Sequence, residues 1–179
     1  MGELPWLENW DHRTTDELIA FERVYRIDSI VCAFEQALGG KANHTEAERV
    51  VLAVEAVERE VNNGGFSQFF CNSSCEYANS AAAALRAIGA PLTADLYERA
   101  LQEVGGGKSA SVEELQLRAL GACGELDSKL SAIDAEYYAG LDEPIAEKAV
   151  RLHKAAPFRY PPVCVLTLWS SGPAGICFE

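Results

Sequence analysis

Hydrophobic positions return every three or four residues along most of this chain, which is the spacing of a helix that buries one face. Over residues 15–38 this spacing predicts one long first helix, ended by Gly39 and Gly40. Alternation typical of strands is scarce before residue 163. The pattern therefore predicts an all-α fold.

A second helix is predicted to begin at a capping box, in which Thr45 and Glu48 each satisfy an unpaired backbone N–H group. Valines spaced three and four residues apart over 50–61 form its core-facing stripe. The Asn-Asn-Gly-Gly run at 62–65 predicts the end of this helix, because Asn and Gly accept the left-handed conformation that often follows one.

Shorter helices are predicted downstream. Ser73 or Ser74 caps a helix that ends before Gly89, and Thr93 starts another that runs to about Val104. Both are bounded by small or glycine-rich segments, which indicates tight turns between packed helices.

A second capping box, Ser111 with Glu114, precedes a long apolar stripe over 115–141. The stripe continues through Gly121 and Gly124, each of which costs about 1 kcal/mol relative to Ala in a helix interior. The segment therefore forms either one bent helix or two abutting helices.

Asp142 before Pro144 begins the last predicted helix, which ends near residue 157. The chain of 179 residues can bury one sizeable core, and a split into two domains would leave each half small. We therefore expect a single compact multi-helix domain over residues 1–157 and a Pro-rich tail over 158–179. Within the tail, residues 163–169 form either an edge strand or an irregular packed segment.

Acidic residues outnumber basic ones by 27 to 15, which gives a net charge of -12. Such a surface repels phosphate backbones and anionic membranes, so we expect no direct nucleic-acid binding, no membrane binding and a basic partner. By segment the charge is -5 over residues 1–40, -2 over 41–90, -7 over 91–150 and +2 over 151–179. The negative charge therefore flanks a nearly neutral middle segment.

The sequence offers little catalytic or metal-binding chemistry. Residues 1–11 contain no secretory signal, so the six cysteines are expected to be free thiols of a cytoplasmic protein. Cys71 and Cys75 have no partner pair at zinc-binding spacing, and none of the three histidines lies in a recognised catalytic motif. The run 105–109 lacks the preceding strand and the leading glycine of a phosphate-binding loop. We expect no metal, no cofactor and no enzymatic activity.

One segment, residues 58–74, combines carboxylates, amides and three phenylalanines. A helical projection places Glu58 about 50° from the centre of the apolar face, which predicts a half-buried carboxylate. Its expected donors are Asn62, the N–H groups of the Gly-Gly turn and Gln68. The group is either a polar latch between two helices or a small-ligand pocket. The latch is favoured, because no second carboxylate or imidazole accompanies Glu58 in the motif core to supply acid–base chemistry.

This segment, followed by Tyr77 and by Leu85-x-x-Ile88-Gly89-Ala90, resembles the signature of a bacterial domain family of largely unknown function that is named after an acidic DNA-mimic protein. Residues 133–138 are similar to the family's second landmark, a hydrophobic–Asp pair before paired aromatics. The resemblance covers residues 45–155. The motif residues, as latch or pocket, are Glu58, Glu60, Asn62, Asn63, Gly64, Gly65, Phe66, Gln68, Phe69, Phe70, Asn72, Ser73 and Ser74.

The resemblance implies an all-helical fold. It also implies, if the family's characterised activity transfers, that the protein occupies the DNA-binding surface of a helix-turn-helix repressor and relieves repression. The family usually has Gly after the second Ser, where this chain has Cys75, and a positive φ at Cys75 would strain the turn. The motif lies in the nearly neutral part of the chain, so the charge that mimicry needs must lie elsewhere.

Mimicry requires carboxylates at a density near that of DNA, about one charge per 1.7 Å of axis. We predict an acidic binding protein that engages a basic protein, such as a DNA-binding regulator. An immunity-type inhibitor of a basic toxin or nuclease would use the same faces, and solubility alone also explains acidic faces. A homodimer is left open. The predicted partner-binding residues are Asp95, Glu98, Glu113, Glu114, Glu125, Asp127, Asp134, Glu136, Asp142, Glu143 and Glu147, joined by Glu103.

Overall fold

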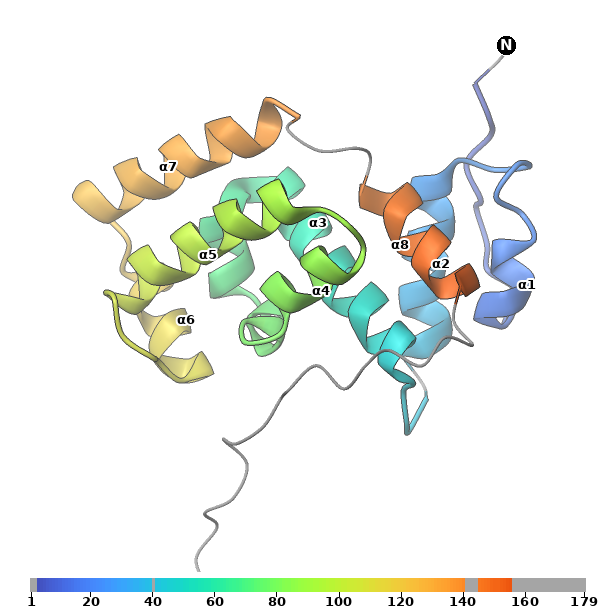
Figure 1. Ribbon diagram of the computed structural model, residues 1–179, viewed down its shortest axis with the longest axis horizontal. Helices are drawn as coiled ribbons and strands as arrows, with labels where there is room; N and C mark the ends of the chain where they lie inside the picture. Colours follow the sequence, from blue (N-terminus) through green and yellow to red (C-terminus); the bar gives the residue numbers. More distant parts are fainter. Residues whose placement is uncertain (1–2, 40, 141–144, 156–179) are drawn as a thin grey trace, which may run out of the picture.

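The computed structural model describes residues 3–39, 41–140 and 145–155, and within these ranges every regular element is a helix (Figure 1). The predicted all-α, multi-helix fold is confirmed. The elements in chain order are α1 (Thr15–Ile19), α2 (Ile27–Leu38), α3 (Glu46–Cys71), the 3₁₀ helix η1 (Ser73–Tyr77), α4 (Ala81–Ala87), α5 (Pro91–Gly105), α6 (Val112–Leu120), α7 (Glu125–Tyr138) and α8 (Ile145–Ala155).

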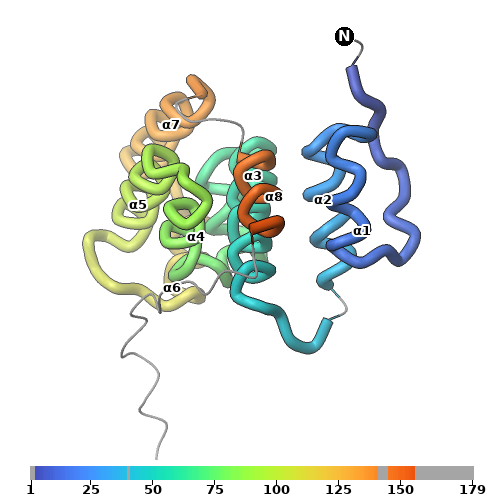
Figure 2. Tube along the Cα trace, turned by 45° about the vertical axis from the view of Figure 1, so that its right-hand side comes forward, coloured from blue at the N-terminus to red at the C-terminus, as the bar shows by residue number. Residues whose placement is uncertain are grey.

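The helices form three layers with α3 at the centre. Figure 2 shows α1 and α2 on one side, α3 and α8 in the middle, and α4 to α7 on the other side. The valine stripe of α3 is almost wholly buried, and α3 contacts α2, α4, α6, α7 and α8. The predicted stripe therefore lies at the core of the molecule.

Both predicted capping boxes are present. Thr45 accepts the Glu48 N–H at 3.3 Å and donates its own N–H to the Glu48 carboxylate at 2.7 Å. Ser111 and Glu114 exchange the same pair of hydrogen bonds at 3.2 and 2.9 Å. A third capping box at Thr14 opens α1, next to the segment that was expected to be one continuous helix.

The prediction of one helix over 15–38 is wrong. The chain turns between α1 and α2, and the Val24 N–H bonds the Phe21 carbonyl at 2.7 Å within this turn. Val24 is 49% exposed, so it does not belong to the buried stripe that the spacing suggested. The Arg26 N–H donates to the Pro5 carbonyl at 2.9 Å, which ties the N-terminal segment to the start of α2.

Two other helix starts differ from the prediction. Residues 73–89 form η1 followed by α4 rather than one helix, because the Ser74 hydroxyl donates to the Glu60 carboxylate instead of capping a helix. The next helix, α5, starts at Pro91 rather than Thr93, with proline in the first helical turn, where its missing N–H costs nothing. Gly89, at φ 83°, marks the end of α4 as predicted.

The segment over 115–141 forms two helices, α6 and α7, rather than one bent helix. Gly124, at φ 60° and ψ -115°, precedes α7 and breaks the helical path. Cys75 does not have a positive φ, so its replacement of the family's glycine strains no turn.

The last helix, α8, packs on α2 and α3. The described residues do not include its predicted start at Asp142. They also do not include the tail over 158–179, with its strand alternative at 163–169. No helix in the described ranges combines the length and apolar character needed to cross a membrane.

Candidate functional site

The family motif contains a break in the central helix. Gly64 has φ -166° and ψ 26°, and Gly65 has φ 75° and ψ -177°, so α3 kinks here and resumes at Phe66. The helix end predicted at 62–65 is therefore a kink inside a longer element. A Cβ atom on Gly65 would lie 2.2 Å from Asp134 Oδ2, and its backbone conformation is essentially restricted to glycine.

Side chains of α7 satisfy the backbone groups that the kink leaves unpaired. In a regular helix the carbonyl of Val61 would accept from residue 65, and the N–H of Phe66 would donate to residue 62. Instead Tyr138 Oη donates to the Val61 carbonyl at 2.5 Å, and the Phe66 N–H donates to Asp134 Oδ1 at 2.8 Å. Residues of the second family landmark, 133–138, therefore satisfy the backbone of the first landmark at the kink. Sequence reasoning did not identify this pairing.

A polar latch is present in the motif, but it is built on Glu60 rather than Glu58. Glu60 is only 7% exposed and accepts hydrogen bonds from Gln68 at 2.9 Å, Asn72 at 2.7 Å and Ser74 at 2.9 Å. Burial opposes ionisation, but these donors outweigh it and hold the pKa of Glu60 below its usual value. The projection onto a straight helix missed this arrangement, because the kink folds the later part of the motif back onto Glu60.

Glu58 is half-buried, as predicted, but none of its expected donors serves it. Gln68 donates to Glu60, Asn62 and Asn63 are exposed, and no described residue donates a hydrogen bond to Glu58. Burial, with a smaller effect from the Asp28 carboxylate, raises the pKa of Glu58 to about 7.

The aromatic residues of the motif anchor it in the core. Phe66, Phe69 and Phe70 are fully buried around Tyr97, with ring centroids 5.4 to 6.2 Å from the tyrosine ring. Tyr97 Oη donates to the Ala78 carbonyl at 3.0 Å. Most of the motif therefore holds helices together, as the latch interpretation expects.

Sequence reasoning missed a second carboxylate near Glu58. Glu55 lies one turn earlier on α3, is 6% exposed and accepts from the Cys32 thiol at 3.8 Å. Burial raises the pKa of Glu55 to about 8, and the Glu58 and Glu35 carboxylates add to the rise. Glu55 lies about 100° around the helix from Val54, off the valine stripe, so helical periodicity did not indicate its burial.

Five of the predicted partner-binding carboxylates of α5 and α7 form ion pairs with exposed cations, namely Asp95, Glu98, Glu103, Glu125 and Glu136. Arg86 Nη2 lies 2.6 Å from Asp95 Oδ1, and Arg86 Nη1 lies 2.7 Å from Glu98 Oε1. Lys129 Nζ lies 3.1 Å from both the Glu103 and the Glu125 carboxylates. Two cations thus each bridge two carboxylates.

The two helices lie side by side (Figure 1), and ion pairs join them. Arg99 on α5 binds Glu136 on α7 at 2.7 Å, and Lys129 on α7 binds Glu103 on α5. A shallow pocket of about 210 Å³ lies between the helices and is lined by Arg99, Gln102, Glu103, Lys129, Ala132 and Ile133. We call the exposed surface formed by Arg86, Asp95, Glu98, Arg99, Glu103, Glu125, Lys129 and Glu136 the α5–α7 face.

Other predicted partner-binding residues lie elsewhere. At about 100° per residue, Asp127 and Asp134 lie on the opposite flank of α7 from Glu125 and Glu136, and Asp134 is engaged by Phe66. The carboxylates that lie on other elements or outside the described ranges are Glu113 and Glu114 at the start of α6, Glu147 on α8, and Asp142 and Glu143 in the undescribed segment 141–144.

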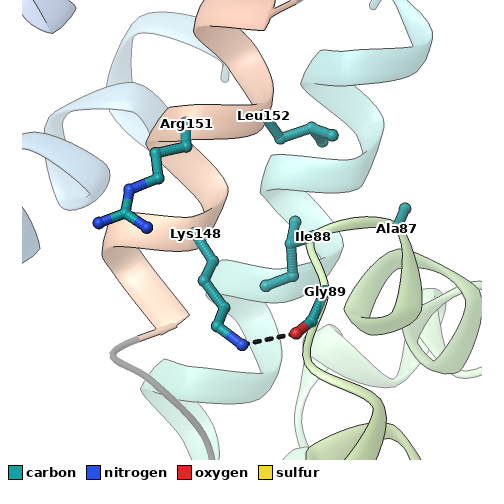
Figure 3. A pocket seen from close by; sticks show the side chains of 6 residues that line it. All are labelled: Ala87, Ile88, Gly89, Lys148, Arg151 and Leu152. Carbon is teal, nitrogen blue, oxygen red and sulfur yellow. Dashed lines mark hydrogen bonds between the residues drawn. The ribbon is translucent and has the colours of Figure 1, made fainter.

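A shallow pocket of about 390 Å³ lies between the α4–α5 turn and α8 (Figure 3). Lys148 reaches across it to the Gly89 carbonyl at 2.5 Å, and the apolar wall includes Ile88 and Leu152. None of its lining residues belongs to the polar latch. Among the described residues, no group of three His, Cys, Asp or Glu side chains is arranged to hold a metal ion.

A family model described as DMP19-like protein matches residues 42–154, which is more than half of the chain. The chain belongs to the DMP19-like family. This DMP19-like region contains α3 to α7 and most of α8, and it leaves out α1 and α2. Comparisons with curated proteins and with solved structures give no match.

Proposed function

We propose that this member of the DMP19-like family is a non-enzymatic acidic binding protein that uses the α5–α7 face to engage a basic protein as a DNA mimic. The proposed partner is the DNA-binding surface of a helix-turn-helix transcriptional regulator. The observation that carries the proposal is the repeated acid–cation–acid arrangement along α5, in which one cation comes from α4 and the other from α7.

Bridged carboxylates are suited to binding because they are already ordered. Each bridge, Arg86 with Asp95 and Glu98 and Lys129 with Glu103 and Glu125, leaves one net negative charge. Immobilising a flexible side chain at an interface costs about 0.5–1.5 kcal/mol. Carboxylates that a central cation already holds avoid much of this cost when a partner's arginine or lysine binds them.

The carboxylate spacing on α5 is comparable to that of a DNA strand. Asp95, Glu98 and Glu103 span eight residues, or about 12 Å at a rise of 1.5 Å per residue. One DNA strand presents a phosphate about every 3.4 Å along the axis, so it presents between three and four over this length. The three carboxylates of α5 therefore match the spacing of the phosphates, while the bridging cations leave a lower net charge than that of DNA.

The test is capture of bacterial lysate proteins on the immobilised full chain, followed by elution with duplex DNA. A DNA mimic releases its partner to DNA and to increasing salt, because both compete for the same basic surface. The double charge reversal Glu98→Lys with Glu136→Lys should abolish capture. The matched control Glu46→Lys with Glu76→Lys changes the charge equally on exposed positions outside the α5–α7 face and should retain capture.

Two outcomes contradict the proposal. Capture that survives both high salt and the Glu98/Glu136 reversal would place binding elsewhere, and a partner that DNA does not displace is not engaged through its DNA-binding surface. An immunity-type inhibitor would use the same carboxylates, so the captured protein's own activity, as a regulator or as a toxin, separates the two functions. No contact favours a ligand pocket at the motif, since the Gln68 and Asn72 amides are bonded to Glu60.

A further inference from the structure

One buried and one half-buried carboxyl group, Glu55 and Glu58, lie where α3 faces α2. Glu55 and Glu58 are three residues apart on α3, and neither forms an ion pair with any described cation. The Cys32 thiol on α2 is a weak hydrogen-bond donor and contacts Glu55 at 3.8 Å. Charged carboxylates buried without a partner are unfavourable, so the neutral forms fit this site.

The acidic groups that face the pair do not stabilise its ionised form. From α2, the carboxylates of Asp28 and Glu35 and the thiol of Cys32 face the pair, and from α7 the hydroxyl of Tyr137 does so. None of these groups stabilises an ionised Glu55 or Glu58 by charge. Arg26 is paired with Asp28 and Arg59 with Glu35, so ionisation of Glu55 and Glu58 would add two uncompensated carboxylates at the α2–α3 contact.

Arg59, a cation close to the pair, is engaged by other groups. It forms an ion pair with Glu35, lies 3.4 Å from the Glu60 carboxylate and donates to Ser74 Oγ at 3.1 Å. Its charge lowers the pKa of Glu55, but burial and the neighbouring carboxylates outweigh it and leave that pKa at about 8. The pair therefore ionises near neutral pH rather than near pH 4.5, the usual value of a glutamate.

α1 and α2 form an outer layer of the fold. α1 and α2 lie outside the family match over residues 42–154, and Figure 2 shows them on the far side of α3 and α8 from the other helices. Apolar residues of α2, including Ile30 and Phe34, hold the layer in place. A change of charge beneath α2 therefore acts first on the contact between α2 and α3.

We propose that protonation of Glu55 and Glu58 controls the docking of the α1–α2 layer on α3. The neutral pair permits close contact with α2. When both groups lose their protons to solvent, the two unpaired carboxylates repel each other and are unfavourable without water, which loosens α2 and lets water reach them. This device goes beyond the proposed function, and it does not depend on which partner the α5–α7 face binds.

Hydrogen exchange of the full-length protein tests the proposal. Protection of the α2 amides, corrected for the intrinsic rate and divided by that of α5, should fall at least tenfold between about pH 6 and about pH 9. Opening releases each carboxyl from its raised pKa of about 7 or 8 toward its ordinary value, so the opening constant rises up to tenfold per pH unit for each group below the raised pKa and levels off above it. The double variant Glu55→Gln with Glu58→Gln should remove this dependence, and Glu46→Gln, on an exposed turn of the same helix, should keep it.

A carboxyl-carbon NMR titration of the folded protein provides a measurement that does not rely on the variants. Two glutamates should titrate near pH 7 to 8, and their signals should be missing in the double glutamine variant. Ordinary titration of all glutamates overturns the proposal. So does α2 protection that stays constant relative to α5, or that falls equally in the double glutamine variant.

Discussion

Replacement of Gly65 by alanine tests how the kink and α7 depend on each other. Gly65→Ala places a Cβ atom 2.2 Å from Asp134 Oδ2 and 2.7 Å from Asp134 Cγ, in a backbone conformation with φ 75° and ψ -177°. The conformation costs an L-residue about 1–3 kcal/mol. Displacement of the Asp134 carboxylate also removes its bond to the Phe66 N–H, worth about 1.5–3 kcal/mol. We expect a total loss of about 3–5 kcal/mol in the free energy of unfolding.

Urea unfolding followed by circular dichroism measures the loss as a shift of the midpoint. Gly107→Ala is the matched control, because Gly107 also has a positive φ, 71°, but no neighbouring atom lies within 4 Å of the position that its Cβ atom would take. In an Asp134→Ala background, Gly65→Ala should cost only the backbone strain, so the two effects should be less than additive. Equal costs for Gly65→Ala and Gly107→Ala, or full additivity with Asp134→Ala, would refute this reasoning.

Three further outcomes are expected. Glu60→Ala should lower stability by about 3 kcal/mol in urea unfolding, because three polar side chains lose a buried acceptor, and Glu46→Ala serves as the exposed comparison. His153 is half-buried, its Nδ1 atom has no hydrogen-bond partner among the described residues, and burial lowers its pKa, so stability should fall as pH drops below about 6.5. His153→Phe should flatten that acid limb of Tm against pH, and an unchanged limb contradicts the assignment. Arg99→Gln should change stability by less than about 1 kcal/mol, because the Arg99–Glu136 pair is half-exposed, and a larger loss would show a structural role.

Features set by neighbouring residues could be predicted from the sequence. The capping boxes at Thr45 and Ser111 need only residues three apart, and the valine stripe of α3 needs only helical periodicity. The first-helix prediction failed because spacing alone does not distinguish a buried apolar residue from Val24, which remains half-exposed. Burial is decided by tertiary contacts that the local pattern does not contain.

The candidate sites depend on residues far apart in the sequence. Phe66 and Asp134 are separated by 68 positions, so the sequence contained both landmarks without indicating that one completes the other. The shift of the latch from Glu58 to Glu60 has a related cause, since a projection onto a straight helix cannot include the kink. Most of the carboxylates over 91–150 were correctly placed on helices, but their distribution over several surfaces follows from how α5, α6 and α7 pack.

The dependence of the kink on α7 also constrains the order in which a newly made chain acquires its shape. Tyr138 is synthesised 77 residues after Val61, whose carbonyl it binds. Until α7 has emerged from the ribosome, the backbone at the kink lacks the Asp134 and Tyr138 side chains that form hydrogen bonds with it. The central helix can therefore reach its final form only late in translation, and a chain that terminates before α7 lacks the means to hold its longest helix in the native bend.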